Sequence, residues 1–305
     1  MASRDAILRL PVALRQSVVT SRPSLASLAP SSPCSSSPRP YATETTHATP
    51  ESSVNHDEVS HFNAMASDWW DPHGSSRLLH LMNPLRHQFI RRCLAPDGLD
   101  PDRKMRYLDI GCGGGIFAES AARMRNVESV TAIDPTPEVL AVAKKHRRTD
   151  PLLLEPGRLT YLQTSIEGLQ TPSDKQYDVI SLFEVIEHIQ RPNPFLQSIL
   201  KQLKPGGWLI GSTIARTPVS WFTTKFVAED ILRMVPRGTH DWNQYIQPQE
   251  MRDWARGQKE LNTSDGVGWH VMGVVYVPGF GWKEVKGSEA WGNYFFAVKK
   301  REGAV

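Results

Sequence analysis

The stretch LDIGCGGGIFAES, residues 108–120, runs from an apolar segment through a glycine-rich turn into a helical pattern. We expect a strand to end at Asp109 and Ile110 and a helix to begin near Phe117. Glycine lets the backbone adopt left-handed conformations and approach a ligand closely, and a helix N-terminus attracts anionic groups. The stretch therefore predicts a nucleotide site at the end of a strand.

The turn by itself leaves the cofactor open, because such turns bind dinucleotides as well as S-adenosylmethionine. The third glycine of the dinucleotide pattern GxGxxG is missing, since Ile116 takes its place. A second apolar run ends at Asp134, about two dozen residues after the first glycine, where a carboxylate can accept hydrogen bonds from both ribose hydroxyls. Dinucleotide enzymes share that acid, and Asp134 could also cap the helix expected after Pro135.

Outward from this turn, strand-like runs alternate with helical patterns. The expected strands are MRYLDIG at 105–111, VESVTAID at 127–134, RLTYLQTSI at 158–166, YDVISLF at 177–183 and GGWLIGSTI at 206–214, with helices at 115–124 and 137–148. This alternation predicts a doubly wound α/β domain with a mostly parallel sheet. Two last runs, at 269–278 and 293–300, lack a long helix between them and predict an antiparallel hairpin. Residues 75–94 have a helical pattern that Asn83 and Pro84 interrupt.

Composition excludes several classes of protein. With 305 residues and 40% apolar content, the chain is long enough for one large core. It has no run of about 18 apolar residues, so we expect no membrane-spanning helix. The net charge of +3 is small and dispersed, so nucleic acid is not the expected partner. Its three cysteines, at 34, 93 and 112, have no CxxC spacing and predict neither a zinc knuckle nor a disulfide framework.

The first fifty residues differ from the rest of the chain. They carry arginines at 4, 9, 15 and 22 among apolar residues, almost no acid, and then a Ser/Pro-rich stretch that cannot form a core. A basic, loosely amphipathic start of this kind is typical of a mitochondrial transit peptide, and a disordered tail is the alternative. We therefore expect the folded domain to comprise residues 51–305.

A second chemical motif lies where the fourth expected strand ends, in YDVISLFEVIEH at 177–188. If a helix begins directly after the strand, Glu184, Glu187 and His188 share one face of its first turn at i, i+3 and i+4. Two carboxylates and an imidazole suit Mg²⁺, Mn²⁺ or Zn²⁺. The alternative is structural, because acids near a helix N-terminus favour the macrodipole and a nearby histidine can cap or pair.

Together these motifs carry a family resemblance. LDIGCGGG, AID, YDVISLFEVIEH and LKPGGWLIGST follow the order and spacing of class I S-adenosylmethionine-dependent methyltransferases, which implies a seven-stranded Rossmann-like sheet. NPLR at 83–86, FEVIEH at 183–188 and the stretch at 228–248 resemble the ubiquinone-biosynthesis O-methyltransferases over about residues 55–300. That family methylates a hydroxyl of polyprenylated catechol intermediates.

The resemblance implies roles for particular residues. The cofactor contacts are Arg86, which could pair with the methionine carboxylate, Gly111, Asp134 and Phe183. The metal ligands are Glu184, Glu187 and His188, with Mg²⁺ as the expected ion and Zn²⁺ or Mn²⁺ as alternatives. Arg86 could instead be a surface cation. We expect His240 as a fourth metal ligand or a general base, and the alternative is that it is a solvated loop residue. Residues 163–166 are expected near adenine by position only.

The resemblance also implies a setting. We expect a peripheral enzyme on the matrix face of the mitochondrial inner membrane, working with other ubiquinone-biosynthesis proteins on a lipid substrate. Residues 217–247 form an insertion whose aromatic residues, including Trp221 and Phe222, predict either an amphipathic helix on an anionic bilayer or packing against the core. Two rival functions stay open: a metal-dependent RNA ribose 2'-O-methyltransferase, and a non-catalytic cofactor-binding subunit of a complex.

Overall fold

The computed structural model describes residues 52–54, 59–60, 66–97, 103–221 and 242–303. The chain divides into two units, residues 1–48 and 49–305, and every described residue belongs to the second. The predicted transit peptide therefore lies outside the described residues, as does His240.

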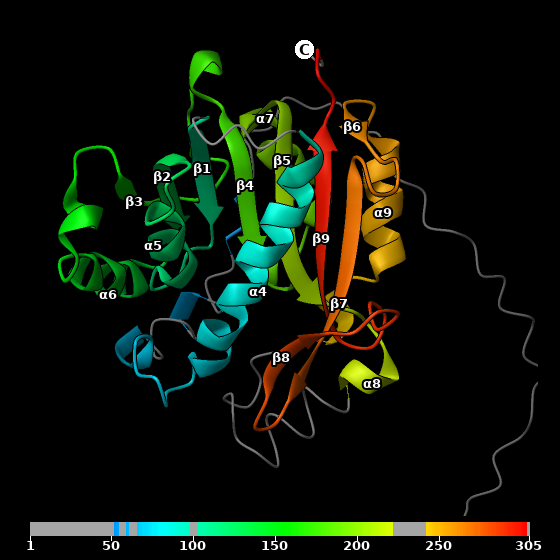
Figure 1. Ribbon diagram of the computed structural model, residues 1–305, viewed down its shortest axis with the longest axis horizontal. Helices are drawn as coiled ribbons and strands as arrows, with labels where there is room; N and C mark the ends of the chain where they lie inside the picture. Colours follow the sequence, from blue (N-terminus) through cyan, green and yellow to red (C-terminus); the bar gives the residue numbers. More distant parts are fainter. Residues whose placement is uncertain (1–51, 55–58, 61–65, 98–102, 222–241, 304–305) are drawn as a thin grey trace, which may run out of the picture. The chain divides into compact units, whose positions relative to one another are not determined.

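A mostly parallel sheet forms the centre of the domain (Figure 1). Its strands are β1 (Met105–Ile110), β2 (Val127–Asp134), β3 (Leu159–Gln163), β4 (Tyr177–Phe183), β5 (Leu203–Ile214), β6 (Leu261–Asn262), β7 (Trp269–Val277), β8 (Gly281–Glu284) and β9 (Asn293–Lys300). They lie in the order β3-β2-β1-β4-β5-β9-β7-β8, and β6 pairs with β9. Strands β1 to β5 are parallel, whereas β9 runs antiparallel to β5 and to β7. The predicted doubly wound α/β fold with an antiparallel end is confirmed.

The seven expected strands all form, but the described part of the chain has nine. The extra strand β8 comes from the segment between the two last runs, which we expected to be a plain connection. Gly279 and Gly281 take positive φ values of 81° and 74°, and this lets the chain turn back so that β8 pairs with β7. The other extra strand, β6, has two residues and pairs with the far end of β9.

Helices cover both faces of the sheet. They are α4 (Arg77–Leu94), α5 (Ile116–Ala122), α6 (Pro137–Arg147), α7 (Pro192–Gln202), α8 (Pro218–Trp221) and α9 (Pro248–Gly257), with 3-10 turns η1 (Ala66–Asp68), η2 (Ala95–Asp97), η3 (Pro151–Leu154), η4 (Ser173–Lys175), η5 (Ile186–His188) and η7 (Trp242–Gln244). Helix α4 is continuous through Pro84, so the expected interruption is wrong. Burial of Met82, Phe89 and Ile90 on the sheet offsets the backbone hydrogen bond that proline cannot donate.

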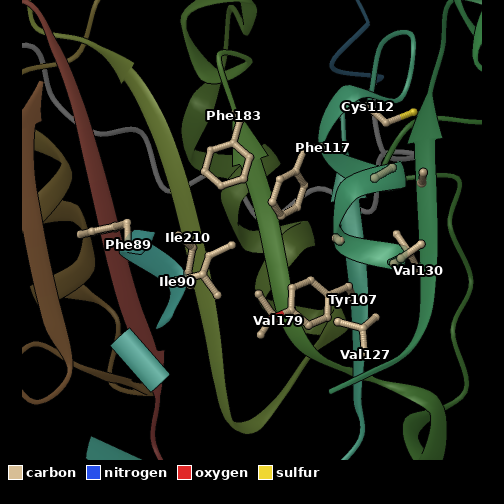
Figure 2. Close-up of a cluster of buried hydrophobic side chains, with 14 of the residues drawn as sticks. Phe89, Ile90, Tyr107, Cys112, Phe117, Val127, Val130, Val179, Phe183 and Ile210 are labelled. Carbon is tan, nitrogen blue, oxygen red and sulfur yellow. The ribbon is translucent and has the colours of Figure 1, made fainter. Parts of the chain in front are cut away.

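Side chains alternate along the strands between two hydrophobic clusters, one on each face. Figure 2 shows the first cluster, in which Phe89 of α4 and Phe117 of α5 pack with Val179 and Phe183 of β4. On the opposite face, Ile180 and Leu182 of β4 pack with residues of α7 and α9. Strand β4 is therefore buried on both faces along its whole length, up to the turn that follows it.

The position of β1 sets where a ligand can bind. Strand β1 pairs with β2 on one side and with β4 on the other, so the strand order reverses at this point. In open α/β sheets, ligands bind outside the carboxyl ends of the strands at such a reversal. Two turns lie there, the glycine-rich turn after β1 and the acidic turn after β4.

Candidate functional site

The glycine-rich turn joins β1 to α5 and has the left-handed backbone that its sequence predicts. Gly111 and Gly113 have φ values of 64° and 52°, a region that residues with a side chain rarely adopt. A side chain at Gly113 would also collide with the indole of Trp69. The sequence interpretation assigned this close approach to a ligand, whereas here a protein side chain occupies the space beside Gly113.

Asp134 ends β2 and joins the glycine-rich turn to the residue before α6. Its carboxylate accepts hydrogen bonds from the backbone N–H groups of Gly113 and Thr136, both at 2.9 Å. Burial raises the pKa of this carboxyl, and those two hydrogen bonds oppose the rise. The N-cap of α6 is Thr136 rather than Asp134. Asp134 therefore lies at the predicted edge of the sheet, paired in register with Gln163 of β3, where the expected adenine segment begins.

Arg86 lies on α4 and reaches the end of β4. It is 4% exposed, and its guanidinium carbon lies 4.8 Å from the centre of the Phe183 ring. Burial lowers the pKa of this guanidinium, while the charges of Glu184 and Asp109 raise it. Among the described residues, its buried Nε has no hydrogen-bond partner. A buried donor without a partner is costly, so this group is suited to an anionic ligand.

Asp109 adds a buried carboxyl beneath the same site. The Ser181 hydroxyl donates a hydrogen bond of 2.6 Å to Asp109 Oδ1. Burial raises the pKa of Asp109 to about 7, although Ser181 and Arg86 oppose the rise. The site therefore combines one buried cation with several buried carboxyl groups at the ends of β1, β2 and β4.

The acidic turn after β4 differs from the helix that we expected. Glu184 has a left-handed φ of 56°, and only Ile186–His188 form a single 3-10 turn. Glu184 cannot belong to an α-helix in this left-handed conformation, and the next helix, α7, begins only at Pro192. The expected α-helical i, i+3, i+4 face is therefore wrong, although the three side chains do lie at the predicted edge of the sheet.

Hydroxyl and amide donors from neighbouring strands hold the two carboxylates. Ser212 donates to Glu184 Oε1 at 2.6 Å, and Asn293 donates to Glu184 Oε2 at 3.2 Å. Thr213 donates to Glu187 Oε2 at 3.0 Å. Sequence reasoning missed these three donors, although a serine and a threonine at the end of the apolar strand β5 were a usable signal.

Glu187 is the more deeply buried of the two acids, at 4% exposed. Burial raises its pKa to about 7, and the negative charge of Glu184 adds to the rise. The charge of His188 and the hydrogen bond from Thr213 act in the opposite direction. A carboxyl with a pKa near neutral can take up or release a proton at physiological pH.

The same side chains do not form a ready metal site. Within the described residues, no group of three or more histidine, cysteine, aspartate or glutamate side chains is arranged to hold a metal ion. Oxygen atoms of both carboxylates already accept hydrogen bonds from Ser212, Asn293 and Thr213. His240, the expected fourth ligand, lies outside the described residues.

The insertion after β5 is described only at its two ends. Pro218–Trp221 form α8, and Trp242 donates its indole N–H to the Thr217 carbonyl at 3.0 Å. Phe222 and most of the other predicted membrane-contacting residues lie outside the described residues. In the part of the chain that the structure describes, we find no helix with the length and apolar character that a membrane crossing requires.

Comparison with known proteins gives a consistent picture. The family model described as a methyltransferase domain matches residues 78–258. The mitochondrial ubiquinone biosynthesis O-methyltransferase of Candida albicans is 39% identical, with 81% of this chain and 86% of that protein covered. The mitochondrial protein of the same name from Schizosaccharomyces pombe is 41% identical, with 81% and 87% covered. The ubiquinone biosynthesis O-methyltransferase of Alkalilimnicola ehrlichii is 40% identical, with 70% and 81% covered.

Solved structures support the fold. The plantazolicin methyltransferase BpumL, in complex with a triazolic desmethylPZN analog and SAH, superposes with a TM-score of 0.51 at 14% identity, covering 81% of this chain and 98% of that one. A SAM-dependent methyltransferase from Thermotoga maritima superposes with a TM-score of 0.50 at 18% identity, covering 80% and 99%. At such low identity these structures bear on the fold alone.

Proposed function

The chain belongs to the ubiquinone biosynthesis O-methyltransferases, and on this premise we propose that it methylates a hydroxyl of polyprenylated catechol intermediates. It is an S-adenosylmethionine-dependent O-methyltransferase with the class I fold. The observation that carries the proposal is the pair Glu184 and Glu187, which lies at the reversal of the sheet beside Arg86 and Phe183.

Four residues would hold the cofactor. The partnerless buried Nε of Arg86 supports a role for this side chain in binding the methionine carboxylate. Asp134, at the end of β2, would accept from the ribose hydroxyls, and the backbone of Gly111 and the ring of Phe183 would complete the contact. When bound, S-adenosylmethionine supplies a methyl group on a positively charged sulfur.

The acidic turn would receive the methyl acceptor. A phenolic hydroxyl has a pKa of about 10, so it is largely protonated at pH 7 and a poor nucleophile. Glu187, with its pKa of about 7, is suited to accept that proton as the oxygen attacks. The hydrogen bond from Thr213 would hold the carboxylate in position for this step.

A divalent cation, Mg²⁺ first, stays a prediction for this site. Two carboxylates and an imidazole within five residues support it, as hard ligands for a hard ion. Glu187 would take the proton, and a cation held at this turn would act as a Lewis acid that lowers the pKa of the catechol hydroxyl. His240 stays a predicted ligand or general base.

The setting is also part of the proposal. The Candida albicans and Schizosaccharomyces pombe relatives carry mitochondrial in their names, and this supports a mitochondrial location here. We assign the enzyme to the matrix face of the inner membrane as a peripheral protein, with the insertion at 217–247 in contact with the bilayer and with other ubiquinone-biosynthesis proteins as partners. A cleaved transit peptide at residues 1–50 fits that location.

One assay tests the proposal against its rivals. Purified protein is incubated with labelled S-adenosylmethionine and either a prenylated catechol or a short RNA, each with Mg²⁺ or with a chelator. We expect label in a methyl ether of the catechol and none in the RNA. Labelled RNA would favour ribose methylation, and cofactor binding without transfer would favour a non-catalytic subunit. Equal catechol turnover with Mg²⁺ and with the chelator would remove the cation from the account.

A further inference from the structure

Two adjacent tryptophans before α4 lie against the glycine-rich turn. We call residues 66–76 the tryptophan strap. The indole of Trp69 fills the space where side chains at Gly113 and Gly114 would otherwise lie. The indole N–H of Trp70 donates to the Gly114 carbonyl at 2.9 Å. Both indoles of the strap therefore contact the backbone of the glycine-rich turn.

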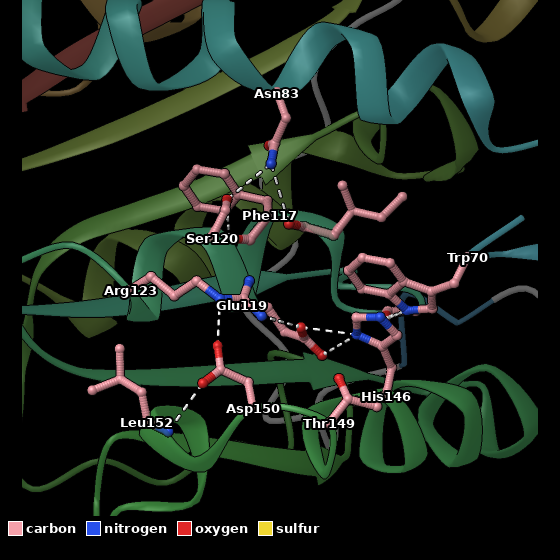
Figure 3. Close-up of polar contacts among 12 residues, drawn as sticks. Trp70, Asn83, Phe117, Glu119, Ser120, Arg123, His146, Thr149, Asp150 and Leu152 are labelled. Carbon is pink, nitrogen blue, oxygen red and sulfur yellow. Dashed lines mark hydrogen bonds and ion pairs between the residues drawn. The ribbon is translucent and has the colours of Figure 1, made fainter. Parts of the chain in front are cut away.

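The strap is fastened to the domain through His146, near the end of α6. The rings of Trp70 and His146 are stacked, with centroids 3.4 Å apart and planes within 4° (Figure 3). His146 Nδ1 lies 2.9 Å from Glu119 Oε2. This contact between the imidazole and the carboxylate orients the plane of the His146 ring.

Glu119 anchors this arrangement from inside the protein. It belongs to α5, the helix that follows the glycine-rich turn, and its side chain is fully buried. Arg123 pairs with Glu119 at 3.0 Å and with Asp150 at 2.7 Å, so the buried carboxylate is well compensated (Figure 3). The anchor and the turn therefore belong to one continuous segment of the chain.

The turn is consequently held from two sides. Asp134, a predicted ribose contact, accepts from Gly113 N, and Trp70 donates to Gly114 O in the next residue. We infer that Trp70 and His146 are positioning residues, which fix the glycine-rich turn in the shape that binds S-adenosylmethionine. This inference rests on the cofactor alone and not on the identity of the methyl acceptor.

The test measures cofactor binding and turnover separately in substituted proteins. Trp70→Leu removes the stack and the indole hydrogen bond, whereas Trp70→Phe keeps a ring against His146. His146→Asn keeps an N–H group directed at Glu119 but removes the stack. A stacked aromatic pair and a hydrogen bond together predict that Trp70→Leu weakens the binding of S-adenosylhomocysteine about 10-fold or more. For Trp70→Phe and His146→Asn we expect about 3-fold weaker binding.

The pattern of kinetic constants separates positioning from general damage. We expect KM for S-adenosylmethionine to rise in parallel with the dissociation constant, while kcat at saturating cofactor stays within about 2-fold of wild type. The matched control is Trp254→Leu, because the indole of Trp254 also donates a hydrogen bond, to Asn193 at 3.1 Å, but on α9. This control should bind S-adenosylhomocysteine like wild type.

Three results would overturn the inference: unchanged binding in folded Trp70→Leu, a fall in kcat without a rise in KM, or equal weakening in the Trp254→Leu control. If Trp70→Leu does not fold, Trp70→Phe and His146→Asn decide the question, since His146 is at the surface with 29% of its side chain exposed. Calorimetry with S-adenosylhomocysteine needs no methyl acceptor. If the wild-type protein binds S-adenosylhomocysteine but does not methylate a catechol, the proposed function is refuted and this inference is still supported.

Discussion

The two turns at the reversal of the sheet are built in opposite ways. The glycine-rich turn after β1 is held largely through its backbone, by Asp134 at Gly113 N and by Trp70 at Gly114 O. The acidic turn after β4 is held through its side chains, by hydroxyl and amide donors on β5 and β9. One turn has a fixed shape, whereas the other has carboxylates with a fixed position and a raised pKa at Glu187.

This difference indicates a division of labour. A turn held largely through its backbone suits a cofactor that has to be kept in one orientation while its methyl group is transferred. A buried carboxyl with a pKa near neutral suits a substrate whose proton has to leave. Substitutions in the two turns should therefore affect different constants, cofactor affinity in one case and the rate of methyl transfer in the other.

The largest expected effect is at the acidic turn. Glu187→Gln keeps an oxygen that can accept from Thr213 but removes the group that takes the proton. We expect kcat for catechol methylation to fall about 100-fold to 1,000-fold, the usual range for a lost general base. The affinity for S-adenosylhomocysteine, measured by calorimetry, should change less than about 3-fold. Equal losses in both quantities would break the division of labour.

The next effect concerns the stability of the scaffold beneath the glycine-rich turn. His87 of α4 contacts the Ser120 hydroxyl of α5 at 2.7 Å, and burial lowers its pKa from 6.5 to about 4. As the pH falls, His87 therefore takes up a proton in the unfolded chain before it does so in the folded protein. The stability that neutral His87 contributes is fully present above pH 6.5 and is lost as the pH falls from 6.5 towards 4.

A comparison with His87→Gln isolates this contribution. Between pH 7 and pH 5 the wild-type protein should lose about 2 kcal/mol more unfolding free energy than the variant, from linkage. Urea unfolding at a series of pH values measures it. Parallel curves for the two proteins would show that His87 is not titrated in this way.

A smaller effect is expected at the buried arginine. Arg86→Lys keeps the charge but loses the planar fork that matches a carboxylate, so S-adenosylhomocysteine should bind about 10-fold more weakly. Arg92→Lys is the control, because Arg92 lies on the same helix and pairs with Glu284 at 2.7 Å at the surface. Similar binding by the two variants would show that Arg86 does not contact the cofactor.

The smallest effect tests how the acidic turn is tuned. The hydrogen bond from Thr213 lowers the pKa of Glu187, so Thr213→Val should raise that pKa further above its ordinary value. Because the ionised form accepts the proton, kcat/KM should rise with pH through about 7 in the wild type. In the variant this rise should lie about 0.7 pH unit higher, because the free energy of one hydrogen bond, about 1 kcal/mol, corresponds to a pKa difference of about that size. If the pH profile of kcat/KM is the same in Thr213→Val as in the wild type, ionisation of Glu187 does not control the rate.

The features that could be predicted from the sequence are those that depend on residues close together in the chain. The strands, the glycine-rich turn and the acid at 134 depend on neighbours within a few residues, and all of them formed where the pattern indicated. The helix expected at Glu184 did not form: Glu184 takes a left-handed φ of 56°, and only Ile186–His188 form a 3-10 turn. Strand β8 was missed because two glycines carry the turn in a segment with weak alternation.

The contacts that shape the site depend on long-range packing, which a single sequence does not reveal. Trp70 meets His146 across 76 positions, and Asn293 reaches Glu184 across 109. No periodic pattern joins such pairs. The paired tryptophans and the Ser212–Thr213 pair were visible as unusual residues in their segments, but only the fold brings each to its partner.

The most direct test is a crystal structure of the protein with S-adenosylhomocysteine and a prenylated catechol. We expect the sulfur of the cofactor beside the glycine-rich turn and its carboxylate at Arg86. We expect a catechol oxygen within hydrogen-bond reach of Glu187 or of a cation that Glu187 holds. A catechol bound away from the acidic turn, with Glu187 still bonded only to Thr213, would contradict it.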